Sequence, residues 1–407
     1  MARRWTPFER VLGAELVSNF GSMLSRLAIP WLAALALDAT PWQMGWLLVA
    51  DVVAGALGSL VLGAWVDRRP LRSVMVWADL WRAALLLALA GLAWHQWLTW
   101  WLLVLAAAAS GLLGVAFELA RSAWIARASE AEALAGRNAA LSASGSVAEA
   151  LAFGLGGWLY QGLGAVVALA VDGVSYLVSA ACLRGVPEAE PGGTPTEART
   201  PTESLTPAIW WAGTRAGWQA VWADAALRQL AVIEALVAAG MSLAGTSYMI
   251  FVTRDLGFAP GPLGMMFALG SLGALAGAAL APRLGRRWGP GPAMGAGLAA
   301  MSLGGLAVAL APDAGLLGAA LLISQQIVGD AGHTVRDVHD RTWRQSAAPP
   351  GMQASVDGGL RAVGHAATLL GALGGGALAT ALGTRSALLG SAALLGLAAV
   401  CAVRRLR

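Results

Sequence analysis

The sequence predicts an all-α membrane protein with twelve transmembrane helices, arranged as two six-helix bundles that repeat one another. Three observations predict it: the composition, the recurrence of long apolar segments, and an internal repeat. Hydrophobic residues make up 57% of the 407 residues and charged residues only 12%, with a mean hydropathy of +0.65. A chain of this composition prefers lipid to water, so most of it is expected to lie in a membrane.

Apolar segments long enough to cross a bilayer recur along the whole chain. About 20 apolar residues span the bilayer core as a helix. The predicted spans are 10–36, 42–66, 73–93, 98–121, 136–160, 164–184, 226–252, 260–282, 290–311, 314–336, 352–382 and 384–403.

The arginines orient these spans. Short cytoplasmic loops retain positive charge, and the arginines gather on alternate loops, whereas the loops on the other side hold only Arg254 and Arg385. With an even number of spans, both termini are therefore expected on the cytoplasmic side of the plasma membrane.

A break in the apolar pattern divides the chain into three parts. Residues 1–184 form the first predicted bundle, 185–223 a cytoplasmic linker, and 224–407 the second bundle. The linker begins with a Pro-, Thr- and Glu-rich stretch that is expected to be disordered. Trp211, Trp218 and Trp222 then fall on one helical face, which indicates either a helix in the membrane interface or one packed on protein.

The two halves resemble each other at a nearly constant offset. A shift of 218 aligns GALGSLVLGAWVDRR (55–69) with GALAGAALAPRLGRR (273–287), and a shift of 219 aligns GGWLYQGLG (156–164) with GGALATALG (375–383). One offset over most of each half predicts a duplicated six-helix unit, an architecture found in secondary transporters.

The first span carries a polar stripe. Glu15, Asn19, Ser22 and Arg26 have helical spacing and lie on one face, which is expected to line a central cavity. Arg26 and Asp51 are expected at similar depths, so we predict an ion pair or a shared polar network between them, with either a structural or a gating role.

Other acids lie deep in the predicted spans. Glu149, Asp172 and Glu234 join Glu15 and Asp51, against the single deep Arg26, so carboxylates are left without an evident basic partner. A charge in the bilayer costs about 2.5–3.5 kcal/mol or more, and a buried carboxyl can exchange a proton near neutral pH. One of Glu15, Glu149 and Glu234 is therefore a candidate proton carrier, and the alternative is that neutral acids brace helix contacts. Asp172 suits the bracing role better, and His365 is expected either to titrate or to make a polar contact.

Further charges cluster at the predicted cytoplasmic ends of the spans. The candidates for cytoplasmic gating among them are Asp79, Arg82, Glu118, Arg121, Asp330 and Arg341, and Arg336, Asp337, Asp340 and Arg344 crowd the same end of the tenth span. His333 and His339 are spaced i, i+6, which does not suit a metal site on one helix, so no metal or cofactor is expected.

The composition excludes several functions. The chain has no lysine, which excludes a Walker-type ATP loop and a lysine Schiff base. Four scattered histidines without a catalytic motif argue against a membrane enzyme. A scaffold or sensor has no use for charges in mid-membrane, and no nucleic-acid partner is expected.

The stretch GAWVDRRPLR (63–72) is similar to the loop between helices 2 and 3 of the major facilitator superfamily. Gly63, Asp67, Arg68 and Arg72 match that pattern, whereas Pro70 stands where glycine is usual. The resemblance implies that Asp67 and its neighbouring arginines latch the two halves on the cytoplasmic face. The alternative is that the arginines only fix topology and Asp67 caps a helix. Residues 117–146, 172–180 and 325–364 resemble the enterobactin-exporter and macrolide-efflux branch.

This resemblance implies a proton-driven exporter of an amphipathic organic compound, such as a drug, macrolide or siderophore-like molecule, working as a monomer by alternating access. Family exporters carry Gly-Pro, two residues and Gly-Gly in helix 5, whereas Ala152 to Gly157 reads AFGLGG and lacks the proline. The uptake of a small metabolite therefore remains the alternative.

Overall fold

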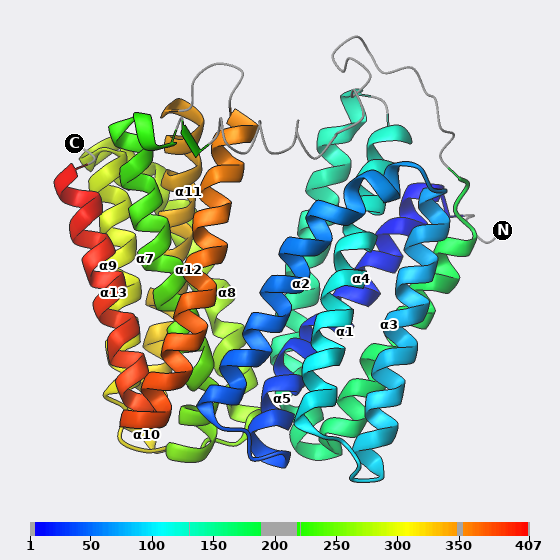
Figure 1. Ribbon diagram of the computed structural model, residues 1–407, viewed down its shortest axis with the longest axis horizontal. Helices are drawn as coiled ribbons and strands as arrows, with labels where there is room; N and C mark the ends of the chain where they lie inside the picture. The colour runs from blue at the N-terminus through cyan, green and yellow to red at the C-terminus, as the bar shows by residue number, and fades with distance from the viewer. Residues whose placement is uncertain (1–4, 130, 189–217, 220, 348–352, 406–407) are drawn as a thin grey trace. The chain divides into compact units, whose positions relative to one another are not determined.

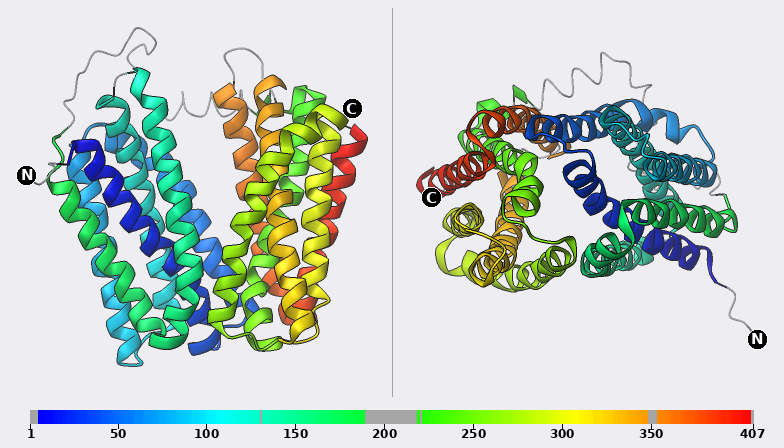
Figure 2. Two further views of the ribbon diagram at one scale, coloured as in Figure 1. Left: turned by 180° about the vertical axis from the view of Figure 1, so that it is seen from behind. Right: turned by 90° about the horizontal axis from the view of Figure 1, so that it is seen from below.

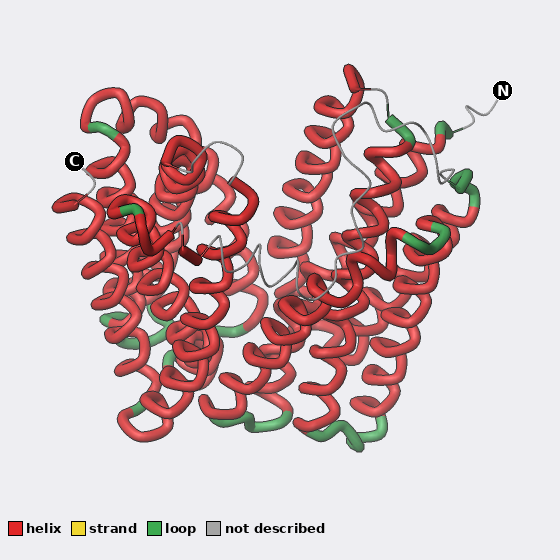
Figure 3. Tube along the Cα trace, turned by 45° about the horizontal axis from the view of Figure 1, so that its top comes forward, coloured by secondary structure: helices red, strands yellow, loops and turns green. Residues whose placement is uncertain are grey.

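The computed structural model describes residues 5–129, 131–188, 218–219, 221–347 and 353–405. All regular secondary structure in these ranges is helical, as Figure 3 shows, which confirms the all-α prediction for them. The chain divides into two compact units. Unit 1 comprises Met1–Ala39, Ala50–Thr194 and Ala259–Ala268; unit 2 comprises Thr40–Val49, Pro195–Phe258 and Leu269–Arg407.

The first half of the chain forms five labelled helices (Figure 1). They are α1 (Pro7–Trp31) with a π-helical turn η1 (Leu32–Ala36), α2 (Pro41–Asp67), α3 (Leu71–Trp94), α4 (Trp100–Arg127) and α5 (Ala131–Arg184). A capping box at Thr6 and Glu9 starts α1. Within α5, Gly164 has φ 78° and ψ 174°, a conformation that suits glycine, so α5 is broken between the predicted spans 136–160 and 164–184.

The second half repeats this order. Its elements are α7 (Ala225–Ile250), η2 (Phe251–Asp255), α8 (Pro260–Trp288), α9 (Pro290–Ala309), α10 (Leu316–Ser324), η3 (Gln325–Gly329), α11 (Asp330–Ala347), α12 (Gln353–Leu382) and α13 (Thr384–Arg405). The predicted span 314–336 is divided by the π-helical turn η3, and its helical path continues to Ala347. Figure 2 shows α13 lying alongside α7 and α9.

Eight helices in the described part of the chain are long and apolar enough to cross a membrane, so the protein is a multi-pass membrane protein. They are α3, α4, α5, α7 with η2, α8, α9, α12 and α13. The stretch of α5 counted here has 42 residues. It would measure about 63 Å, roughly twice the bilayer core. Its break at Gly164 divides it into pieces of about one crossing each. Charged side chains make α1 and α11 more polar than these eight helices.

Backbone irregularities recur at one offset. The π-helical turns η1 and η2 begin at Leu32 and Phe251, a separation equal to the shift of 219 seen in the sequence. Asp38 and Gly257 have φ of 49° and 83°, and Gly164 and Gly383 have φ of 78° and 86°; each pair has the same separation. The same separation relates two exchanged segments: unit 2 includes residues 40–49 of the first half, and unit 1 includes residues 259–268 of the second half. The offset seen in the sequence therefore extends to local backbone geometry.

These exchanged segments are held by close backbone packing. In unit 1, the Gly261 amide donates a hydrogen bond of 2.8 Å to Gln161 Oε1. In unit 2, Gly376 lies so close to Pro41 that an added Cβ would be 3.0 Å from the Pro41 carbonyl oxygen. Small residues allow such approaches between membrane helices, where van der Waals packing replaces the hydrophobic effect as the driving force.

Candidate functional site

The first charged cluster lies in unit 1 between α1 and α4. Glu15 is 5% exposed, and its Oε1 accepts hydrogen bonds from Arg121 Nη1 and, at 3.1 Å, from Asn19 Nδ2. Arg121 also donates through Nη2 to Glu118, one turn earlier on α4. One guanidinium therefore serves two carboxylates, and the buried Glu15 Oε2 has no hydrogen-bond partner in the described part of the chain.

This cluster corrects the expectation that Glu15 lacks a basic partner. The sequence has Arg26 as its single deep arginine and predicts Arg121 among the cytoplasmic gating residues. Arg121 is instead largely buried, with its side chain 14% exposed, and it pairs with Glu15 on α1. Glu118 remains exposed, at 59% for its side chain, as expected for a residue near a helix end.

The second cluster lies in unit 2 between α7, α11 and α12. Glu234 Oε2 accepts hydrogen bonds from Arg336 Nη2 and, at 2.8 Å, from Arg344 Nη2. Arg344 also pairs with Asp340 at 2.7 Å and Asp357 at 3.3 Å. The prediction that Glu234 lacks a basic partner is therefore wrong as well, since it contacts two arginines that the sequence analysis had placed only in a cytoplasmic latch.

Glu15 and Glu234 occupy corresponding places. Their separation equals the shift of 219 that relates the two halves, and each pairs with arginine from the fourth helical segment of its half. The offset was visible in the sequence and was the signal that could have linked them. Their surroundings differ: Glu15 shares one arginine with Glu118, whereas Glu234 has two arginines on a single oxygen.

A third polar group fills the interior of unit 1. Asp79 on α3 is fully buried and accepts a hydrogen bond of 2.6 Å from Ser179 Oγ, with Arg82 Nη1 at 3.8 Å. The Arg82 guanidinium lies 4.9 Å from the Tyr176 ring centroid. The sequence predicts Asp79 and Arg82 in a charge cluster near the cytoplasmic end of the third span. They are inside the unit because α3 packs this face against α5.

Asp172 and Tyr176 on α5 extend this group toward α1. Asp172 is 1% exposed and accepts a hydrogen bond of 3.2 Å from Ser175 Oγ, and Tyr176 shares one of 2.7 Å with Ser22. Gly21 packs directly against Asp172 and Ser175, which leaves no room for a Cβ. Tyr176, which the sequence analysis did not single out, therefore links α1 to the buried arginine.

The corresponding positions of unit 2 are apolar. A shift of 219 takes Asp79, Arg82 and Tyr176 to Leu298, Met301 and Leu395. All three belong to the buried hydrophobic core of unit 2. The duplicated fold therefore does not need this polar group, which is specific to the first half.

Other candidate residues are not brought together. Arg26 and Asp51 form no ion pair in the described residues, and Arg26 Nη1 lies 3.8 Å from the Met23 sulfur, although its charge still acts on Asp51. Glu149 and His365 are both exposed, and the described part of the structure gives neither of them a hydrogen bond or ion pair.

The 63–72 stretch forms the end of α2 and the start of α3. Gly63 and Asp67 lie in the last turns of α2, and their side-chain surroundings are outside the described part of the structure. Arg68 is exposed. Arg72 pairs with Glu188 at 3.5 Å and donates to the Val186 carbonyl at 3.3 Å, so it ties α3 to the segment after α5.

The remaining gating candidates lie on α11. Asp330 faces α8 at Gly270, and Arg341 is exposed. Beyond the predicted span, burial raises the pKa of the Asp340 carboxyl, although Arg336 and Arg344 act in the opposite direction. Burial also lowers the pKa of His339, whose Nε2 lies 3.1 Å from the Ala281 carbonyl oxygen. A search of the described residues finds no group of histidine, cysteine or acidic side chains that could hold a metal ion.

Comparison with known proteins identifies the fold. Residues 11–334 match the family described as the Major Facilitator Superfamily. No curated protein matches the chain.

Three solved structures share the fold at low sequence identity. A crystal structure of a mutant of the nucleoside transporter NupG has a TM-score of 0.81 and 13% identity, covering 99% of this chain and 100% of that one. A bacterial homologue of the iron transporter ferroportin in the inward-facing state has a TM-score of 0.75 and 17% identity, and the match covers 98% of each chain. A bacterial homolog of the human lysosomal transporter Spinster has a TM-score of 0.73 and 16% identity, and the match covers 98% of this chain and 97% of that one.

Proposed function

This chain belongs to the major facilitator superfamily, and from that premise we propose that it is a proton-coupled secondary transporter that exports an amphipathic organic compound by alternating access. Membership makes it a transporter of small molecules and not an enzyme. The proposal adds twelve spans in two six-helix bundles, a monomeric state, and both termini on the cytoplasmic side of the plasma membrane.

Glu15 carries the proton-coupling part of the proposal. Its neighbourhood holds two carboxylates and one guanidinium, and one of its own oxygens has no hydrogen-bond partner in the described residues. When Glu15 takes a proton, Arg121 keeps Glu118 as its counter-ion, so no buried cation is left unpaired. Proton uptake at this position therefore avoids the large cost of an isolated charge in a membrane interior.

Glu234 suits a structural role. Its Oε2 is the shared acceptor of Arg336 and Arg344, two largely buried arginines that join α11 to α7. We therefore assign Glu234 to a permanent ion-pair network that holds α7 against α11. The two corresponding acids thus have different proposed roles, with Glu15 exchanging protons and Glu234 joining helices.

The export direction and the substrate class have separate support. Residues 117–146, 172–180 and 325–364 resemble the enterobactin-exporter and macrolide-efflux branch, which favours a drug-like or siderophore-like molecule. The proline missing from residues 152–157 favours the second candidate, a proton-coupled importer of a small metabolite.

Transport in proteoliposomes tests the proposal. Purified protein is reconstituted into lipid vesicles that are loaded with ethidium. Dye movement is then followed under a pH gradient imposed in either direction. Export by antiport predicts that dye moves against the proton flow, and collapse of the gradient with an ionophore should stop it. Movement of dye together with protons would support the importer instead. Movement that ignores the gradient would contradict proton coupling.

A further inference from the structure

Unit 1 carries a groove on its surface at the end of the bundle where α2 turns into α3. The groove has a volume of about 430 Å³ and is formed by α2, α3 and α4, which is within the usual range for small-molecule pockets. Its rim holds Trp65, Arg69, Trp77 and Trp81. The apolar lining comes from Val74, Ala78, Leu113 and Ala116.

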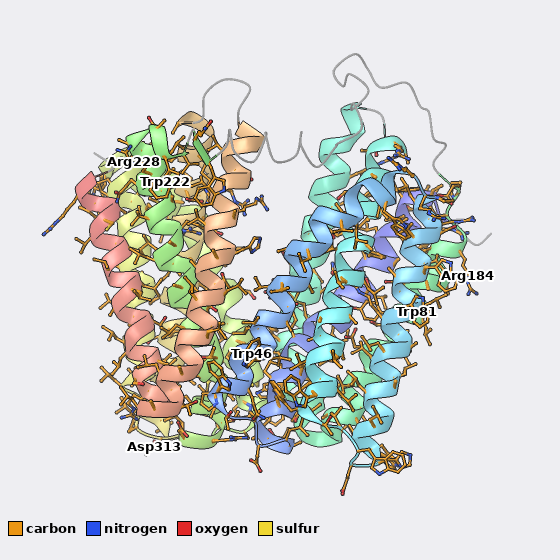
Figure 4. The ribbon with its side chains drawn as sticks, in the orientation of Figure 1. Trp46, Trp81, Arg184, Trp222, Arg228 and Asp313 are labelled. Carbon is orange, nitrogen blue, oxygen red and sulfur yellow. The ribbon has the colours of Figure 1, made fainter. Side chains whose placement is uncertain are left out.

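The rim is rich in exposed indole rings. Trp65, Trp77 and Trp81 are 46%, 60% and 58% exposed, and Figure 4 labels Trp81 on α3. Trp77 and Trp81 stack with their ring centroids 6.4 Å apart. These exposed indole rings give the groove an apolar border along which a hydrocarbon chain can pack.

A positive charge stands at the mouth of the groove. The Arg69 guanidinium lies 5.5 Å from the Trp65 ring centroid. Arg68 and Arg69 are both exposed, and neither has an acidic partner within 4.0 Å among the described side chains. This end of the groove therefore presents positive charge to an anionic group.

The axial spacing matches one lipid leaflet. Trp77 and Trp81 follow Leu71, the first residue of α3, by six and ten positions, which places them about 9 and 15 Å along the helix. Half of a bilayer core is also about 15 Å. An acyl chain that runs from Arg69 past Trp77 to Trp81 would thus cross its own leaflet beside the apolar lining.

The second half of the chain supports a dedicated role for this groove. Its corresponding turn keeps the basic pair Arg286 and Arg287. A shift of 219 takes Trp77 and Trp81 to Ala296 and Ala300. The shared fold therefore does not require indoles at the positions of Trp77 and Trp81.

We propose that the groove between α2, α3 and α4 binds one phospholipid with an anionic headgroup, its phosphate on Arg69 and one acyl chain along Trp77 and Trp81. The choice of an anionic lipid rests on the proposed orientation, which places this end at the cytoplasmic leaflet. There the anionic lipids attract basic side chains by about 1 kcal/mol each, or roughly fivefold in affinity.

Native mass spectrometry of the purified, delipidated full-length protein tests this. It is titrated with dioleoylphosphatidylglycerol or with dioleoylphosphatidylcholine, which have the same acyl chains. The first phosphatidylglycerol should bind about fivefold more tightly. Arg69→Gln should abolish that preference, whereas the control Arg287→Gln should keep it. Equal binding of the two lipids, or equal effects of the two variants, would overturn the proposal.

The acyl-chain part has its own test. Ser73→Trp fills the groove and should weaken the first binding event for both lipids. The double variant Trp77→Ala, Trp81→Ala, which changes only exposed side chains, should do the same. Unchanged binding in both would overturn the groove as the site, and displacement of the lipid by glycerol 3-phosphate at equal concentration would show a free-phosphate site instead. These readouts need no transported substrate, so their failure is distinct from a failure of the proposed transport function.

Discussion

The interiors of the two units differ in polarity although their backbones repeat. Unit 1 encloses Asp79, Arg82 and Tyr176, and unit 2 has Leu298, Met301 and Leu395 at the corresponding places. Charges inside a membrane protein cost stability, and unit 2 shows that the fold does not need polar side chains at these three positions. The comparison teaches that the two halves place their buried charges differently: unit 1 has a polar group here, whereas unit 2 is apolar here and has its buried arginines beside Glu234.

The largest expected effect separates the two corresponding acids. Glu15→Gln should reduce pH-driven dye transport in proteoliposomes to the level of protein-free vesicles, because the glutamine neither gains nor loses a proton. Exchange of dye at equal pH on both sides should survive. Glu234→Gln is the matched control: it should lower the unfolding temperature and keep pH-driven transport in the folded fraction. Equal transport loss in both variants would contradict the division of roles.

The charge balance of the two clusters predicts unequal stability losses. Arg121→Gln leaves Glu15 buried without a cation and should cost about 3–5 kcal/mol. Arg344→Gln should cost less, because Arg336 still neutralises Glu234. Thermal unfolding in detergent measures both. The Arg121→Gln loss should shrink as the pH falls, since the stranded carboxylate then becomes neutral, and a pH-independent loss would argue against this explanation.

Transplanting apolar residues tests the polar interior directly. The double variant Asp79→Leu, Arg82→Met gives unit 1 the side chains that unit 2 has at those places. Replacing a buried ion pair by apolar side chains of similar size is often neutral or stabilising by about 1–4 kcal/mol. We expect unchanged or higher thermal stability together with reduced transport. A variant that fails to fold would show that the polar interior of unit 1 is structural.

Two corresponding glycines sharpen the comparison further. A Cβ at Gly21 would clash with Asp172 and Ser175, whereas one at Gly240, its counterpart in the second half, would be 3.3 Å from its nearest neighbour, the Ser391 carbonyl oxygen. Gly21→Ala should destabilise the protein by about 1–3 kcal/mol, as overpacking does. Gly240→Ala should cost less in the same thermal unfolding experiment. A larger stability loss for Gly240→Ala than for Gly21→Ala would mean that α1 moves away from α5 easily.

The smallest effect is expected at Tyr176. Tyr176→Phe removes the hydrogen bond to Ser22 and keeps the ring beneath Arg82. Side-chain hydrogen bonds in membrane proteins average about 0.6 kcal/mol, so the unfolding temperature should fall only slightly. A larger fall would indicate that the hydroxyl organises the whole polar interior, and Ser22→Ala provides the matched test from the other side of the bond.

The sequence by itself determined the helical segments, the broad class and the internal repeat. Apolar length fixes where a helix can cross lipid, and a duplicated pattern produces duplicated turns, so Gly164 and Gly383 both have a positive φ. The candidate residues Glu15, Asp172 and Glu234 were also visible, because any charge stands out in an apolar span.

Only the tertiary structure decided which charges are partners. Arg121 reaches Glu15 and Arg344 reaches Glu234 across more than a hundred positions of the chain, and helix packing alone sets those contacts. The sequence places Asp79 and Arg82 in a charge cluster near the end of a span, and it does not show that a neighbouring helix covers them. Partner choice depends on which faces of distant helices meet, and that information is spread over every residue of the packing interface.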